Sequence, residues 1–171
     1  KKEGEKLIIL ATKFKQYHPK DFYPDFYLSK GYFINSDFAS AKGFADSAII
    51  KNRKNPYPYE ILSDINIIKS ESNEAQKNIN LTVKNAVLSL EEFETKINLL
   101  MQEINANHSI NRKSDAHTLK QEINEIQRVI EKSFLNLRKV TTSEKLKTYI
   151  EGFVSKYPKN PLILKIGRAH V

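Results

Sequence analysis

The sequence predicts an all-α fold in which helices follow one another as antiparallel pairs. Apolar residues recur at the three- and four-residue spacing of a helix, and no stretch carries a convincing strand alternation. A set of identities also returns at one constant offset along the chain, which indicates a repeated helical unit. With 171 residues, of which 40% are apolar, the chain is long enough for one domain with a hydrophobic core.

Residues 1–72 are expected to form four helices. The first ends before Pro19, because the residue that precedes a proline disfavours helical backbone. Pro24 and Pro58 each open a later helix, since the first turn of a helix tolerates proline. The expected bounds of the four helices are about 5–17, 24–35, 38–51 and 58–69.

Residues 73–140 are expected to form a longer helical hairpin. Its first helix runs from about residue 73 to 105, with a break near Ser89 as an alternative, and polar residues 106–116 form the loop. The apolar stripe of the first helix is Ile79, Val83, Val87, Leu90, Phe93, Ile97, Leu100 and Ile104. That of the return helix is Leu119, Ile123, Ile126, Ile130, Phe134 and Leu137.

One further helix is expected within residues 141–165. Thr141 and Glu144 match a capping box at its start, and Tyr157-Pro158 closes it. Pro161 is placed to begin another helix.

The 34-residue offset is carried by seven identical pairs within a short span. The pairs are Tyr23/Tyr57, Pro24/Pro58, Leu28/Leu62, Ser29/Ser63, Ile34/Ile68, Ser36/Ser70 and Ala41/Ala75, and Ala11/Ala45 extends the offset backward. Small residues at these spacings lie on one helical face and let a neighbouring helix approach closely. We therefore interpret residues 1–72 as successive copies of one unit, the first of them partial.

Over about residues 6–75 the chain resembles the tetratricopeptide (TPR) repeat family, whose unit is about 34 residues long. The residues that match the family pattern are Leu28, Tyr32, Ala41, Ala45, Ala48, the turn Ser36-Asp37-Phe38 and the closing Asn55-Pro56. Asp25, Ser29 and Thr82 depart from the usual Trp, Gly and Ala. The resemblance implies an α-solenoid of antiparallel helix pairs, continued here by the longer hairpin and the final helix.

Both ends of the sequence suggest a piece of a longer protein. The chain begins without Met, and residues 166–171 resemble the translation of a sequencing adapter, so we treat them as a non-native scar. Without Arg168 the balance is 27 basic against 20 acidic residues, a net charge of +7. Apolar faces are expected to stay exposed at residues 7–14 and 162–164.

The basic excess is mostly Lys interleaved with acidic residues, so a nucleic-acid partner is not favoured. No apolar run approaches the roughly 20 residues that span a bilayer. The absence of Cys excludes disulfides and thiolate metal sites. The compartment stays unassigned, with the cytoplasm slightly favoured.

No catalytic motif, metal site or cofactor is expected. His108, His117 and Asp115 share the predicted loop, but a zinc site needs three or four convergent ligands, and loop residues are usually solvated. Asp21 and Asp25 are interpreted as solvated helix or cap positions, because nothing in the sequence indicates the buried environment of a general acid.

A peptide-binding groove is the candidate site that the resemblance implies, because the first helices of TPR units line a concave surface. The groove-facing candidates are Tyr23, Phe26, Tyr27, Lys30, Phe33, Tyr57, Glu60, Asp64 and Ile67. The alternative is that this aromatic set packs in the core. Lys30 and Asp64 occupy equivalent positions in the two units and carry opposite charges. A site lined by charges of one sign, which would hold a carboxylate, is therefore not expected.

We carry two functions forward from the sequence. The first is a non-catalytic protein-interaction or scaffold module that binds another protein or a peptide segment. The alternative is a helical accessory domain of a larger enzyme, such as a bacterial glycosyltransferase or a surface-polysaccharide protein. The hairpin at 73–138 either packs on the repeats or projects and dimerises as a coiled coil.

Overall fold

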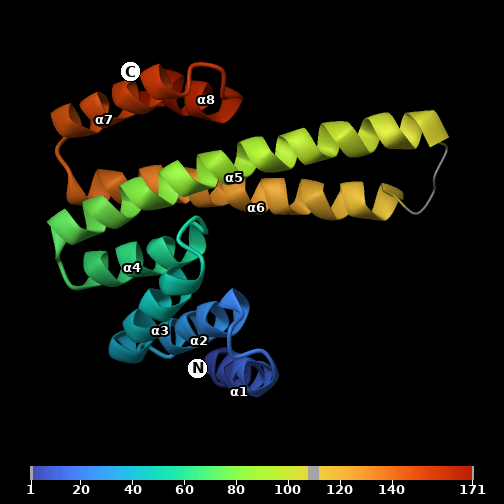
Figure 1. Cartoon of the computed structure of the whole chain (residues 1–171). Helices are drawn as coiled ribbons and strands as arrows, with labels where there is room; N and C mark the ends of the chain where they lie inside the picture. Colours follow the sequence, from blue (N-terminus) through green and yellow to red (C-terminus); the bar gives the residue numbers. More distant parts are fainter. Residues whose placement is uncertain (1, 108–111, 171) are drawn as a thin grey trace.

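The computed structural model describes residues 2–107 and 112–170, and within these ranges the chain is all-helical (Figure 1). The helices are α1 (Lys2–Tyr17), α2 (Phe22–Ile34), α3 (Phe38–Lys51), α4 (Tyr57–Ile68), α5 (Ser72–Asn107), α6 (Arg112–Val140), α7 (Ser143–Lys156) and α8 (Pro161–His170). Each helix packs on the next one in the chain up to α6, and α7 packs on both α6 and α8. The described residues therefore form a stack that runs from α1 at one end to α7 and α8 at the other.

The structure confirms that the first helix of the hairpin is continuous, whereas the predicted bounds of the loop are wrong. α5 continues through Ser89 without a break, because Ala86, Val87 and Leu90 keep its buried stripe in helical phase. α6 already begins at Arg112, so the part of the predicted loop from residue 112 to 116 is helical. The polar composition of this stretch suits the first turn of a helix as well as a loop.

The 34-residue offset recurs in the backbone geometry. Ser36 after α2 and Ser70 after α4 both have positive φ, 66° and 60°, a conformation that few residues other than Gly and Asn adopt. The amide of the residue after each serine bonds back across the helix end, from Asp37 N to Tyr32 O at 3.0 Å and from Glu71 N to Asn66 O at 2.8 Å. The same helix-ending turn is thus built twice, at the offset of the sequence repeat.

Small residues mark the closest helix contacts. Alanines at five of the matched or neighbouring positions are at most 3% exposed: Ala11, Ala41, Ala45, Ala48 and Ala75. Between α1 and α2 the approach is closer still, since a Cβ on Gly4 would lie 2.8 Å from the carbonyl oxygen of Gly31. Larger side chains at these positions would push the helices apart.

Asp25 contradicts the sequence interpretation, which made it a solvated residue. Its side chain is 1% exposed and lies between three helices. Lys15 of α1 contacts Oδ1 and Lys51 of α3 contacts Oδ2, each at 2.6 Å. The position is buried because α1 and α3 both close over α2, and the two lysines supply the counter-charge that a buried carboxylate requires.

The main hydrophobic core joins the last four helices. It contains Ile79, Val83, Val87 and Leu90 of α5, Ile126, Ile130, Phe134 and Leu137 of α6, Ile150 of α7, and Leu162, Ile163 and Ile166 of α8. The expected exposure of residues 162–164 is therefore wrong for Leu162 and Ile163, because α8 turns back onto α7. The expected exposure of residues 7–14 is confirmed at Leu10 and Phe14, whose side chains are 64% and 37% exposed. Ile166 belongs to this core. That residues 166–171 are a non-native scar stays a prediction, because packing does not test it.

The start of α7 differs by one residue from the predicted capping box. Thr142, not Thr141, is the N-cap, and its hydroxyl accepts a bond from Lys145 N at 3.5 Å. Thr142 has the extended backbone that a capping residue needs and directly precedes the first helical residue.

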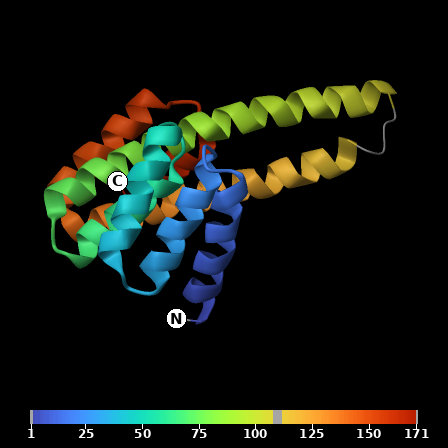
Figure 2. The ribbon, with the colours of Figure 1, turned by 60° about the horizontal axis from the view of Figure 1, so that its bottom comes forward.

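The long hairpin both packs on the repeats and projects from them. Near its base α6 contacts α4, whereas the far ends of α5 and α6 extend beyond the other helices (Figure 2). Along the base, the apolar stripe of α5 is covered by α6 of the same chain, and dimerisation through the hairpin stays a prediction.

We expect Asp25→Ala to lower the free energy of unfolding by about 3 kcal/mol, because it leaves two lysines facing each other without their carboxylate. Urea denaturation followed by circular dichroism measures the change. Asp46→Ala on the exposed face of α3 is the control, and its effect should stay within about 0.5 kcal/mol. Equal stability of the two variants would contradict the structural role of Asp25.

Candidate functional site

A groove of about 610 Å³ lies between α2, α4 and α6, with α5 at one edge. Eight of the nine predicted groove residues line it, and Ile67 does not: the eight are Tyr23, Phe26, Tyr27, Lys30, Phe33, Tyr57, Glu60 and Asp64. The structure thus brings these eight side chains together, while their role in binding stays a prediction.

The aromatic wall of the groove is one face of α2. Tyr23, Tyr27 and Lys30 follow one another at spacings of four and three residues, which places them on the same side of the helix. Tyr23 and Tyr27 are 55% and 37% exposed, and their rings stack with centroids 6.3 Å apart. A pair of exposed, mutually supported phenol rings offers a rigid apolar surface with polar tips.

Phe26 and Phe33 line the groove and also pack against residues of α4, while binding by the aromatic set stays a prediction. Phe26 packs against Tyr57 of α4, with ring centroids 5.5 Å apart. Phe33 packs on the cluster of buried residues around Ile61 and Ile65. These two rings tie α2 to α4, which leaves the two tyrosines as the accessible part of the wall.

α6 supplies the opposite wall, which the sequence analysis did not include. Its contribution consists of Glu122, Glu125, Ile126, Arg128 and Lys132, and α5 adds Ser89 and Phe93. The sequence shows that α6 carries polar residues on one face and an apolar stripe on another. That this face meets α2 and α4 depends on contacts between segments that are far apart along the chain.

Lys132 is the centre of the ion-pair network in the groove. Its ammonium contacts Glu60 Oε1 at 2.7 Å and Asp64 Oδ2 at 2.6 Å, so it joins α6 to α4. Asn136 donates to the second oxygen of Asp64 at 2.8 Å. The counter-charge of Asp64 therefore comes from α6.

The pKa of Lys132 is raised by this arrangement. Burial alone would lower the pKa, but the charge of Glu60 and the hydrogen bonds to Asp64 and Glu60 outweigh it. The ammonium thus stays protonated below the ordinary lysine range, which keeps the positive charge that links α4 to α6.

Tyr57 lies in a part of the groove where nearby carboxylates make the electrostatic environment negative. Burial, together with the charges of Glu125, Glu60 and Glu122, raises the pKa of its phenol from 10.0 to about 12. Arg128 acts in the opposite direction but is paired with Glu125, at 2.8 Å. Among the described residues, Glu122 forms no ion pair and so adds an uncompensated negative charge at this edge.

The described residues hold no group of three or more His, Cys, Asp or Glu side chains placed to bind a metal ion. His117 and Asp115 are exposed on α6, and His117 shares a hydrogen bond with Gln121. His108 lies outside the described residues. His18 packs on Phe14 at the end of α1 and lies 3.5 Å from Asp21.

No protein-family model matches the chain, and comparison with the curated proteins and with the solved structures found no match. Across the described ranges, none of the helices is both long and apolar enough to pass through a bilayer.

We expect Lys132→Ala to lower the free energy of unfolding by about 1–2 kcal/mol, since Glu60 and Asp64 lose their shared cation while partly solvated. Urea denaturation measures the loss. Arg128→Ala removes an exposed ion pair of the same helix and should change stability by less than about 0.5 kcal/mol. A larger loss for Arg128→Ala than for Lys132→Ala would show that the network does not hold α6 on α4.

Stability should fall as the pH rises from 10.0 to about 12, because the unfolded chain releases the Tyr57 proton before the folded chain does. A raised pKa in the folded state stabilises the fold below pH 10.0 and loses that contribution as the phenol ionises. Tyr57→Phe removes the phenol and with it this pH-dependent contribution. The difference in the free energy of unfolding between variant and wild type therefore measures the contribution, at up to about 2–3 kcal/mol. Parallel decline of both proteins would contradict the assignment, and ultraviolet absorbance of phenolate should show one late step that the variant lacks.

Proposed function

We propose that this chain is a non-catalytic protein-interaction module of the tetratricopeptide type, and that the groove between α2, α4 and α6 holds a segment of another protein. The single observation that carries the proposal is the gathering of the eight predicted residues in one groove. Its size, about 610 Å³, suits a short peptide segment with one or two anchoring side chains.

The repeat geometry supports the tetratricopeptide interpretation. The two serine turns at positive φ, the paired buried alanines and the matching buried leucines Leu28 and Leu62 all recur at the offset of the sequence repeat. In an α-solenoid of helix pairs each unit contacts its neighbours, and the successive contacts from α1 to α5 follow that scheme. We infer that α1 to α5 form the start of such an array and that α6 closes its groove.

The chemistry of the groove favours a partner segment with apolar anchors and basic residues. Tyr23 and Tyr27 offer stacked rings on which aliphatic, aromatic or cationic groups pack. Four carboxylates line the groove against three cations, and Lys132 is already shared between Glu60 and Asp64. Glu122 and the paired Glu125 lie across from the aromatic wall, where an incoming Lys or Arg would compensate them.

A selection from a displayed library of random peptides on the whole chain tests the proposal. We expect enriched peptides to contain Lys or Arg beside apolar residues, and to bind the Tyr23→Ala, Tyr27→Ala double variant at least about tenfold more weakly. Both side chains are exposed, so the variant should fold. Tyr17→Ala on α1, where the ring is 79% exposed and outside the groove, is the control and should bind as wild type.

The result that would overturn the proposal is equally direct. If no peptide is enriched, or if enriched peptides bind the double variant and wild type equally, the groove between α2, α4 and α6 is not a peptide site. Far-ultraviolet circular dichroism of each variant separates loss of binding from loss of folding.

A further inference from the structure

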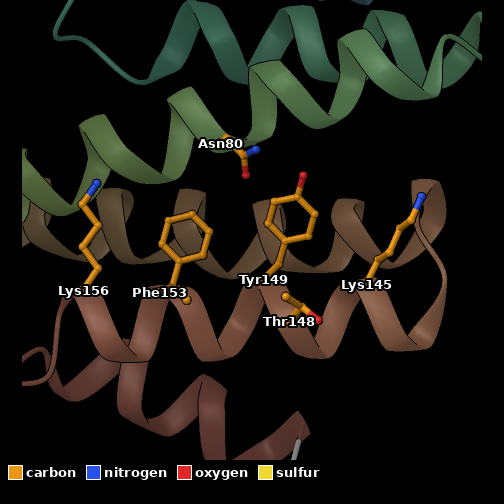
Figure 3. A pocket seen from close by; sticks show the side chains of 7 residues that line it. Asn80, Lys145, Thr148, Tyr149, Phe153 and Lys156 are labelled. Atoms are coloured by element: carbon orange, nitrogen blue, oxygen red, sulfur yellow. The ribbon is translucent and has the colours of Figure 1, made fainter.

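A second groove of about 380 Å³ lies on the other side of α5, between this helix and α7 (Figure 3). Six of its lining residues share one face of α7, at spacings of three, one, three, one and three: Lys145, Thr148, Tyr149, Gly152, Phe153 and Lys156. Asn80 of α5 faces them. None of these residues lines the groove between α2, α4 and α6, so the two sites are separate.

The floor of this second groove is aromatic and held in place. The hydroxyl of Tyr149 donates to Gln76 Oε1 of α5 at 3.4 Å, and the ring of Phe153 packs edge-on against Phe134 with centroids 5.5 Å apart. Figure 3 shows both rings directed towards α5. Because neighbouring helices orient them, the two rings form a preformed apolar surface.

Gly152 keeps the centre of the floor open. A Cβ built at this position meets no atom within 4 Å, so internal packing does not require glycine here. Glycine is nonetheless a poor helix former in the middle of a helix. Its presence leaves the backbone of α7 accessible between Tyr149 and Phe153.

The two ends of the groove are positively charged. Lys145 and Lys156 lie eleven positions apart, close to a whole number of turns, and Figure 3 shows both directed to the side of α7 that faces α5. No carboxylate lines the groove, and neither lysine forms an ion pair among the described residues. Asn80 adds a buried Oδ1 that receives no hydrogen bond.

We propose that this groove binds an extended acidic segment of another protein, with two carboxylates on Lys145 and Lys156 and two apolar side chains on Tyr149 and Phe153. The lysines are about 16 Å apart along α7, and the two rings about 6 Å. In an extended peptide, side chains two positions apart lie on one face about 6.6 Å from each other.

The probe that follows from these spacings is the acetylated and amidated peptide Glu-Ser-Leu-Ser-Leu-Ser-Glu, in which both Glu and both Leu share one face. Isothermal titration calorimetry on the whole chain measures its Kd. Replacing both Lys145 and Lys156 by Gln should weaken binding at least about tenfold, and so should Gly152→Leu, which fills the floor. The peptide with Lys in place of both Glu should not bind.

Matched controls distinguish this site from general charge and helix effects. Lys42→Gln with Lys120→Gln removes two exposed positive charges elsewhere, and both positions lie outside the groove. Gly43→Leu substitutes a mid-helix glycine that is equally open, on α3. Both controls should bind the acidic peptide within about twofold of wild type.

Three outcomes would overturn the proposal. One is no detectable binding at about 1 mM peptide. Another is equal weakening by Gly43→Leu and Gly152→Leu. The third is a concentration-dependent dimer in sedimentation equilibrium that Gly152→Leu abolishes, because the occupant is then a second copy of this chain. Failure at the groove between α2, α4 and α6 leaves these measurements unaffected.

Discussion

The burial of one stripe of α5 against α6 is the constraint on which the rest of the described structure depends. Ile79, Val83, Val87 and Leu90 are each at most 1% exposed, and they face an equally apolar stripe of α6. The same core also receives α7 and α8, so burial of this apolar area stabilises the packing of all four helices. The hairpin is therefore the element against which both ends of the stack are assembled.

Both candidate grooves are consequences of this arrangement. α4 packs on one side of the hairpin and brings α2 with it, which leaves the groove closed by α6. α7 packs on the other side, and the face of α7 that carries Tyr149 and Phe153 at the edge of the core forms the second groove with α5. The hairpin thus separates a groove lined by four carboxylates and three cations from one whose charged lining residues are two lysines.

Charges play different parts at different depths in this structure. Asp25 is almost fully buried and is matched by two lysines from flanking helices, because an unpaired carboxylate at this depth would be strongly unfavourable. Lys132 is partly exposed and joins α4 to α6 through Glu60 and Asp64. Lys145 and Lys156 contact no carboxylate among the described residues, which leaves them available to a ligand. The overall charge of +8 predicts none of these three situations.

Much of the local structure could be read from the residues in order. Prolines, helical spacing and the repeated identities located the helices to within a few residues, because these signals act within one or two turns of the chain. The resemblance to the tetratricopeptide pattern placed Tyr23 and Tyr27 among the candidates, and both side chains are exposed. Three features were not predictable from local signals. They are the α6 side chains in the same groove as these tyrosines, the burial of Asp25 and the return of α8 onto α7. They depend on which distant helices meet, and that choice arises from the summed packing of many side chains, which no local pattern contains.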